Sequence, residues 1–507
     1  MPELKLTSRE LATREIWMDT AVELSLETEC LLPDYEPEVF RIVKALARPV
    51  LERTSVNGDR IQLDGSCQLS ILYLGAQPGD LRAVRQKLPF SKTVELSQSA
   101  QDNTFVECNA RMSFVNARAV SSRRLEVRCG ISLRTRVTAE KKYPVVIAAE
   151  GMGVQLHRKE LSASLPHREA EKNFTMSEDL MLGQAKPPFG SLLDAEYHLS
   201  CTDRKIMEER MIVRGDLTTR ILYCPEGGGE PERMEWSEPV SQLLDIPGLS
   251  EDDSCDVYPT QIDANFEPIR EDGGCRRLSA EWNITLRACC DRNETFEAAD
   301  DGYSCRYPAE TDIRSVPLPR VLGTIRQTID AEGTAKIGSI EKLFAVLPSL
   351  GEYSCRSEGE KLILSGTVET VILYEADGTI SSADKTVLFE TPFEVEGKNM
   401  SFFPAISILS ADGTVREDGI ALQIRLMASG NVYESGEEKL LCGMVTNEET
   451  PFLLSGAAIR ICYAEPNESL WEIAKRSHVP LEAMMNENGL TGERTSRQML
   501  LIPMVTE

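Results

Sequence analysis

The chain has 507 residues, of which 41% are apolar, and it carries a formal net charge of −26. This length and apolar content predict three or four domains with ordinary hydrophobic cores. An acidic field of this size argues against nucleic acid and anionic lipid as partners; it permits a basic protein partner, although solubility is the simpler interpretation.

The N-terminal residues, the lack of a long apolar run and the cysteines predict a cytosolic protein. Residues 1–10 lack a basic start followed by an apolar run, which argues against a signal peptide, and no segment approaches 18 consecutive apolar residues. The 14 cysteines are mostly isolated and form no CxxC pair, so they are interpreted as reduced thiols. The adjacent Cys289 and Cys290 are interpreted as core residues at a strand end, with a reactive pair as the alternative.

The first predicted elements follow a turn-rich segment, residues 33–37, which reads Pro-Asp-Tyr-Glu-Pro. Residues 38–46 carry apolar side chains at helical spacing, which predicts one short helix. Residues 61–73 instead alternate apolar and polar side chains. A period of two is typical of a half-buried β-strand.

One motif then recurs three times in the body of the chain. It consists of a glycine, five residues and Ile-Leu-Tyr, with steps of 150 and 151 residues between the glycines. The copies are Gly65 with Ile71-Leu72-Tyr73, Gly215 with Ile221-Leu222-Tyr223, and Gly366 with Ile372-Leu373-Tyr374. A proline follows each tyrosine after 16 to 18 residues, at Pro89, Pro239 and Pro392. The period is too long for a solenoid repeat and predicts tandem domains.

The long links between the copies, around residues 140–185 and 290–335, also alternate. Because long structureless loops are rare inside a compact body, we expect these links, and residues 1–30, to add strands that join neighbouring modules. The fold class is therefore mainly β, with three tandem antiparallel sandwich-like or barrel-like modules. The expected domains are 1–165, 166–320, 321–455 and a small C-terminal unit, 456–507.

The body resembles the SPOCS domain family of spore-forming Firmicutes. The resemblance rests on residues 32–38 with the first motif, and on residues 213–223 with Pro239 and Ile246-Pro247-Gly248. The third copy keeps its motif and Pro392-Phe393 but lacks the Ile-Pro-Gly element.

Motifs for chemistry are missing from the sequence. The four histidines, His157, His167, His198 and His478, show no metal-ligand spacing, and neither a nucleophile elbow nor a phosphate-binding loop occurs. We therefore expect no catalytic, cofactor-binding or metal-binding residues and a protein that is not an enzyme. Glycoside hydrolysis stays a distant alternative because carboxylates are plentiful.

The C-terminal residues predict a βααβ unit. Residues 459–463 and 499–502 are expected as strands, and Ser469 with Glu472 as a capping box that opens a helix. Its inner face would carry Leu470, Ile473 and Ala474. Pro480 suits the first turn of a second helix with Leu481, Met484 and Met485 facing inward, and Asn488-Gly489 would end it.

This unit resembles a LysM module, a family that binds N-acetylglucosamine polymers. The two loops that form the glycan groove differ here: Asn467-Glu468 replaces the usual Gly-Asp, and Arg497 precedes Gln498 where glycine is usual. Trp471 is expected to be half-exposed, either as an interface anchor or as part of the small core. The predicted partner-binding face comprises Asn467, Ser469, Leu470, Trp471, Lys475, Asn486, Asn488 and Gln498.

SPOCS modules followed by one LysM resemble the spore coat morphogenetic factors of Clostridia. The resemblance implies a mother-cell cytoplasmic scaffold at the forespore surface, which assembles coat through protein–protein contacts and has no cofactor. Its LysM would dock onto stage IV sporulation protein A, the polymerising ATPase of the coat basement layer, and other coat proteins would be further partners. The alternative is a cell-wall protein whose LysM reads peptidoglycan or cortex glycan.

Overall fold

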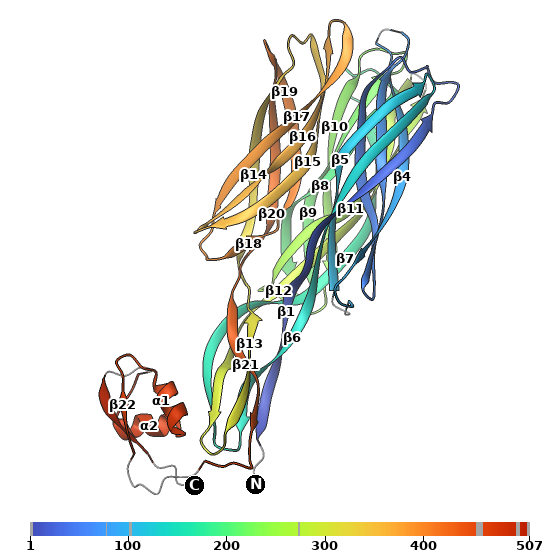
Figure 1. The fold of residues 1–507 in the computed structure, drawn as a ribbon. Coiled ribbons are helices and arrows are strands. Elements are labelled where there is room, and N and C mark those ends of the chain that lie inside the picture. The colour runs from blue at the N-terminus through green and yellow to red at the C-terminus, as the bar shows by residue number, and fades with distance from the viewer. Residues whose placement is uncertain are drawn as a thin grey trace.

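The computed structural model describes residues 4–77, 79–100, 104–271, 274–452, 460–492 and 497–503 (Figure 1). Within these residues the chain is almost entirely antiparallel β-structure, with two short helices near the C-terminus. The prediction of a mainly β fold is therefore confirmed. Neither helix has the length and apolarity needed to cross a bilayer.

The first module is a sandwich of two antiparallel sheets, in the orders β2-β3-β4 and β1-β6-β5. Its strands are β1 (Lys5–Leu31), β2 (Arg41–Asn57), β3 (Arg60–Leu74), β4 (Leu81–Glu95), β5 (Thr104–Ser121) and β6 (Arg124–Glu150). The predicted helix at residues 38–46 is wrong, because β2 pairs with β3 along its length and this pairing overrides the local spacing.

The second and third modules repeat this arrangement. In the second, sheet β10-β9-β8 faces sheet β11-β12-β7; in the third, sheet β15-β16-β17 faces β14-β20-β18, where β19 also pairs with β20. The second has β7 (Val154–Met181), β8 (Phe189–Met207), β9 (Arg210–Pro225), β10 (Glu232–Asp245), β11 (Ser254–Glu271) and β12 (Gly274–Ser304). The third has β14 (Arg320–Lys336), β15 (Lys342–Glu358), β16 (Lys361–Ala376), β17 (Thr379–Glu394), β18 (Met400–Phe402), β19 (Ala405–Arg416) and β20 (Gly419–Glu434).

The recurring Ile-Leu-Tyr motif serves two hydrophobic cores at once. Successive residues of a strand point to opposite faces. In the second module, Ile221 and Tyr223 therefore lie in the core of their own sandwich, while Leu222 lies in a core shared by all three modules. Leu72 and Leu373 contribute to that shared core from the other two copies. The motif thus specifies both the folding of each module and the docking between modules.

The glycine of each motif allows a close approach of the neighbouring strand. At Gly215, an added Cβ would collide with the carbonyl oxygen of Ser200, beside a β-bulge between Cys201 and Asp203. Gly65 meets the Val50 carbonyl in the same way, and Gly366 meets that of Glu352.

The third proline of the pattern is not structurally equivalent to the other two. Gly65 pairs with Phe90 and Gly215 with Val240, but Gly366 pairs with Phe389. Pro392 therefore lies further along its strand than Pro89 and Pro239 do. The sequence match at Pro392-Phe393 was misaligned because the hairpin before it is shorter.

A narrow stalk extends from one end of the three sandwiches (Figure 1). It consists of three antiparallel ribbons: the start of β1 with the end of β6, the start of β7 with the end of β12, and β13 (Ala309–Pro317) with β21 (Glu437–Thr446). Its core includes Leu11, Tyr143, Leu165, Phe296 and Leu440. The prediction that the long links form strands joining the modules is confirmed.

Candidate functional site

The C-terminal module is a βααβ unit made of β22 (Arg460–Ala464), α1 (Leu470–Ser477), α2 (Leu481–Asn488) and β23 (Gln498–Ile502). Leu470, Ile473, Ala474 and Met484 are buried in its core, and Leu481 and Met485 pack against them, as predicted. Gly489 ends α2 with φ of +63°, also as predicted, in the left-handed region that glycine favours. Residue 459, the expected start of the first strand, lies outside the described residues.

The predicted capping box is wrong in its hydrogen bonds. Ser469 is the N-cap of α1 with an extended backbone, but its side chain makes no capping bond within the described residues. Instead, the Ser469 carbonyl oxygen accepts a hydrogen bond from the Ile473 N–H at 3.2 Å.

The eight residues of the predicted partner face have different surroundings. Leu470 belongs to the module core. Asn488 ties α2 to β23, because its side-chain amide donates to the Leu501 carbonyl and its Oδ1 accepts from the Leu501 N–H, both at 2.7 Å. Asn467 and Asn486 are exposed, while Ser469 and Gln498 are partly buried. The remaining two, Trp471 and Lys475, contact the stalk.

Trp471 is packed against the end of the stalk, which corrects the prediction that it is half-exposed. Its side chain is only 7% exposed. The indole Nε1–H donates to Oδ2 of Asp301 at 2.7 Å, and the ring lies 4.8 Å from Tyr303 and 5.1 Å from His157, centre to centre. The Lys475 ammonium donates to both oxygens of the same carboxylate, at 2.8 and 2.7 Å.

A β-bulge in β12 prepares this contact. Ala299 pairs with Arg158 and Asp301 with His157, so that Asp300 is the extra residue. Bulges re-aim side chains. Asp300 bonds His157 Nδ1 at 2.6 Å, which leaves Asp301 for the C-terminal module.

Two further contacts complete this interface. The hydroxyl of Tyr303 donates to the Val479 carbonyl oxygen at 2.7 Å, and burial raises the pKa of that tyrosine. Phe452 stacks on His478 with ring centres 3.7 Å apart. Burial lowers the pKa of His478, with a smaller contribution from Arg460. Sequence reasoning missed Asp301 and Tyr303; the only local signal was a pair of acids interrupting an alternating strand.

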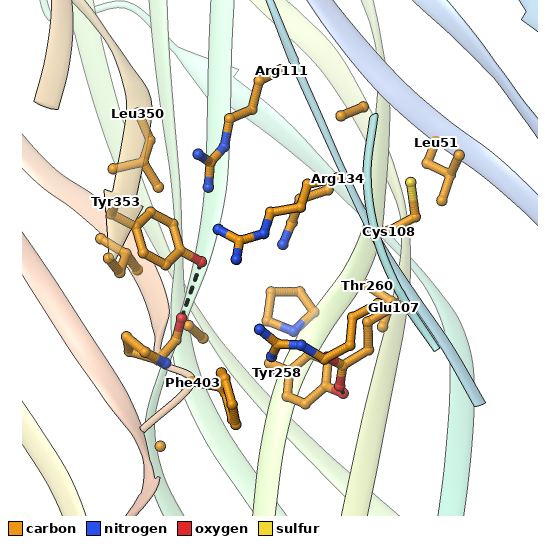
Figure 2. Close-up of a pocket in the computed structure, with 18 of the residues that line it drawn as sticks. Leu51, Glu107, Cys108, Arg111, Arg134, Tyr258, Thr260, Leu350, Tyr353 and Phe403 are labelled. Atoms are coloured by element: carbon orange, nitrogen blue, oxygen red, sulfur yellow. Dashed lines mark hydrogen bonds between the residues drawn. The ribbon is translucent and has the colours of Figure 1, made fainter. Parts of the chain in front are cut away.

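A second concave site lies where the three modules meet. It is an open cavity of about 3310 Å³ lined by all three modules. Figure 2 shows Arg111 and Arg134 of the first module pointing across it towards Tyr353 and Phe403 of the third. The Arg111 guanidinium carbon lies 4.6 Å from the Tyr353 ring centre, and that of Arg136 lies 3.7 Å from Phe403. Cation–π contacts therefore span the gap between these modules.

The arginines of this cavity are only partly neutralised. Asp19 pairs with both Arg134, at 3.1 Å, and Arg136, at 2.9 Å. Among the described residues Arg111 forms no ion pair, and burial lowers its pKa. The cavity as a whole also carries many carboxylates, including Glu107, which accepts a hydrogen bond from Tyr258 at 2.7 Å.

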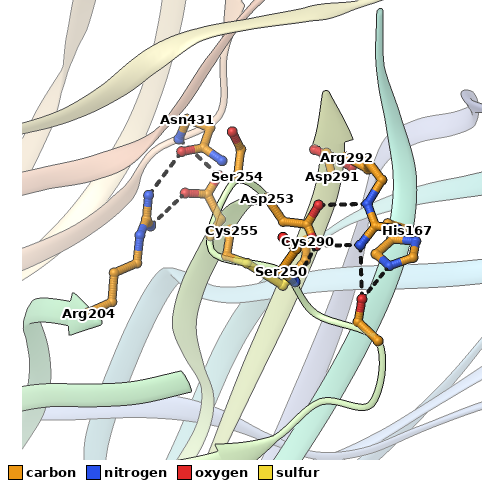
Figure 3. The surroundings of a disulfide bond; sticks show 12 residues. His167, Arg204, Ser250, Asp253, Ser254, Cys255, Cys290, Asp291, Arg292 and Asn431 are labelled. Carbon is orange, nitrogen blue, oxygen red and sulfur yellow. Dashed lines mark hydrogen bonds and ion pairs between the residues drawn. A yellow bond between two sulfur atoms is a disulfide. The ribbon is translucent and has the colours of Figure 1, made fainter. Parts of the chain in front are cut away.

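One pair of cysteines in the second module corrects the prediction that the cysteines are reduced thiols. Cys255 and Cys290 are direct partners on β11 and β12, both fully buried, and form a disulfide (Figure 3). Sequence spacing could not reveal this pairing because 35 residues separate the two. Cys289 lies on the other face of β12, and burial raises its pKa to about 12. Strand alternation thus separates Cys289 from Cys290, and the two do not act as a pair.

Figure 3 also shows a charged network beside the disulfide, in which Arg292 forms an ion pair with Asp253 at 2.9 Å. In the described part of the chain, no three His, Cys, Asp or Glu side chains gather as a metal site requires. We therefore take the contact surface between the stalk end and α1 as the candidate functional site.

Two stretches of the chain, residues 38–120 and 190–269, match the family model "SipL, SPOCS domain". They cover essentially β2 to β5 of the first module and β8 to β11 of the second. The chain is a SipL-like SPOCS-domain protein. No curated protein and no solved structure matches it significantly. The SipL family is related to sporulation and is not a known enzyme family.

Proposed function

We propose that this SPOCS-domain protein is a non-enzymatic scaffold of the spore envelope. It would act in the mother-cell cytoplasm at the forespore surface and dock through its C-terminal LysM-like module onto stage IV sporulation protein A. The observation that carries the proposal is the SPOCS match in a body that places one small βααβ module at the end of its stalk.

The architecture suits a scaffold that connects two surfaces. The shared core, which includes Leu72, Leu222 and Leu373, holds the three modules together, and the stalk extends from one end of them (Figure 1). The C-terminal module can then contact one partner while the body contacts others. Trp471 favours a protein partner, because tryptophan is enriched among residues that dominate interfaces.

Binding of the full chain to purified stage IV sporulation protein A tests this proposal. We expect Trp471→Ala to weaken binding by at least about tenfold, since an interface anchor contributes about 2 kcal/mol or more. Tyr463→Ala is the matched control, because Tyr463 is 74% exposed on β22 of the same module. Unchanged binding by a folded Trp471→Ala variant would contradict the choice of face.

Sedimentation with purified cortex distinguishes the alternative function. A scaffold that binds protein stays in the supernatant, whereas a glycan reader sediments with the cortex. Retention that is lost on substituting Asn467 and Gln498, the positions that correspond to the glycan-groove residues of LysM modules, would replace the protein-docking proposal with peptidoglycan binding.

A further inference from the structure

We propose that the end of the stalk masks the α1 face of the C-terminal module and so regulates the access of a partner to that face. The masking itself stands on contacts within this chain, and only the identity of the regulated partner rests on the proposed function. The occupant of the face in this structure is the bulged end of β12, from Asp301 to Tyr303.

Asp301 is the centre of the polar contact between the stalk and α1. Its carboxylate accepts hydrogen bonds from the Trp471 indole and the Lys475 ammonium, and from the Gly302 N–H at 2.8 Å. The Asp301 side chain is 16% exposed and that of Lys475 is 36% exposed. Trp471 is thereby held by two aromatic neighbours on the stalk, Tyr303 and His157, and by one charged acceptor.

The same residues therefore have two incompatible uses. A partner that takes Trp471 as its anchor must displace Asp301, because the indole N–H donates one hydrogen bond. Partner binding then requires the undocked state. The apparent affinity is the intrinsic affinity multiplied by the fraction of molecules in that state. The ion pair of Lys475 with Asp301 keeps some exposure to water, so that it is weak enough to open.

The chain is anchored to the stalk just before the module. Phe452, the last described residue before the module, bonds through its N–H to the Arg306 carbonyl oxygen at 2.8 Å. This backbone bond belongs to the stalk and does not involve the α1 face. Loss of the Asp301 contact can therefore release Trp471 while the module stays attached beside Arg306 through this bond and through the stack of Phe452 on His478.

Fluorine NMR of the full chain labelled with 5-fluorotryptophan measures the masking without any partner. The chain has four tryptophans, and Trp471→Phe identifies the signal of Trp471. We expect that signal in the wild type to be insensitive to solvent. Asp301→Asn and Tyr303→Phe should move it towards the solvent-exposed position and leave the other three unchanged. Both substitutions lie on the stalk and leave every residue of the module intact.

Binding to stage IV sporulation protein A then measures the regulation. Asp301→Asn and Tyr303→Phe should each bind at least about tenfold more tightly than the wild type. Asp312→Asn is the matched control, since Asp312 is an exposed stalk residue whose carboxylate pairs with Arg314 of its own strand.

Each outcome separates the two proposals. A solvent-exposed Trp471 signal in the wild type, or no change in either variant, would overturn the masking. Released Trp471 with unchanged affinity would overturn the regulation. Failure of every form, released or not, to bind stage IV sporulation protein A would refute the proposed partner, whereas the fluorine signal would still decide the masking.

Discussion

The two neighbouring residues Ile221 and Leu222 offer a test of how one motif serves two cores. Both are almost fully buried, at 0% and 2% exposed, and they differ mainly in the core that they enter. Truncation of either to alanine removes a similar apolar volume, and such truncations destabilise by about 2–5 kcal/mol. We therefore expect costs of similar size that appear in different parts of the molecule.

Hydrogen–deuterium exchange of the full chain locates each cost. Ile221→Ala should reduce protection throughout the second sandwich, including β9 and β12, by about 2–5 kcal/mol. Leu222→Ala should leave that sandwich protected and instead expose the ends of β3 and β16, where Leu72 and Leu373 lie. Solution scattering should also show a larger radius of gyration for Leu222→Ala alone, because only the docking between modules is weakened.

The reasoning fails if the two variants give the same exchange pattern. Equal loss of protection inside the second sandwich would mean that Leu222 supports its own module rather than the shared core. An unchanged radius in Leu222→Ala, together with unchanged exchange at Leu72, would show that polar contacts alone hold the modules together.

Three further predictions concern buried groups. Buried Asp194 of the second module forms an ion pair with partly buried Arg48 of the first, with Nη2 and Oδ2 2.7 Å apart. In chemical denaturation, Asp194→Ala should cost up to about 3 kcal/mol, because Arg48 keeps some contact with water, whereas Arg48→Met with Asp194→Leu should be nearly neutral. Burial lowers the pKa of His198 to about 4, so the unfolded chain binds a proton that the native chain does not as pH falls from about 6.5 to 4. The free energy of unfolding should therefore decrease by up to about 3 kcal/mol over that range, and His198→Asn should flatten that part of the pH profile of stability. Thiol titration of the denatured, unreduced protein should find the 12 free cysteines and not Cys255 or Cys290, with all 14 reacting after reduction.

The alternating pattern predicted the strands well because it reflects a local property, the period of the pleat. It extended correctly to the links between the copies. The helix at residues 38–46 failed because apolar spacing over nine residues is compatible with two structures, and only the pairing with β3 decides between them. The shared core was missed for a related reason: Leu72 and its equivalents occupy the parity that a half-buried strand gives to solvent.

The site at the stalk end could not be predicted from local patterns. Trp471 and Asp301 lie 170 residues apart in sequence, and no periodic signal connects them. The helical part of the core of the C-terminal module was nevertheless predicted correctly, because the inner faces of α1 and α2 follow helical spacing. Amphipathic spacing thus identified the inside of the module but gave no indication of what covers its outside.

The three ribbons of the stalk explain why this covering contact can be specific. The first two ribbons continue β1, β6, β7 and β12 without a break, but the third is interrupted, since β13 precedes β14 and β21 follows β20 as separate strands. The C-terminal module is tethered to the third ribbon through β21, yet it contacts Asp301 on the second. Because tether and contact lie on different ribbons, chain connectivity alone does not impose the contact. Its position depends on the bulged end of β12, and we therefore expect substitution of Asp301 to alter access to Trp471 without altering the attachment of the module.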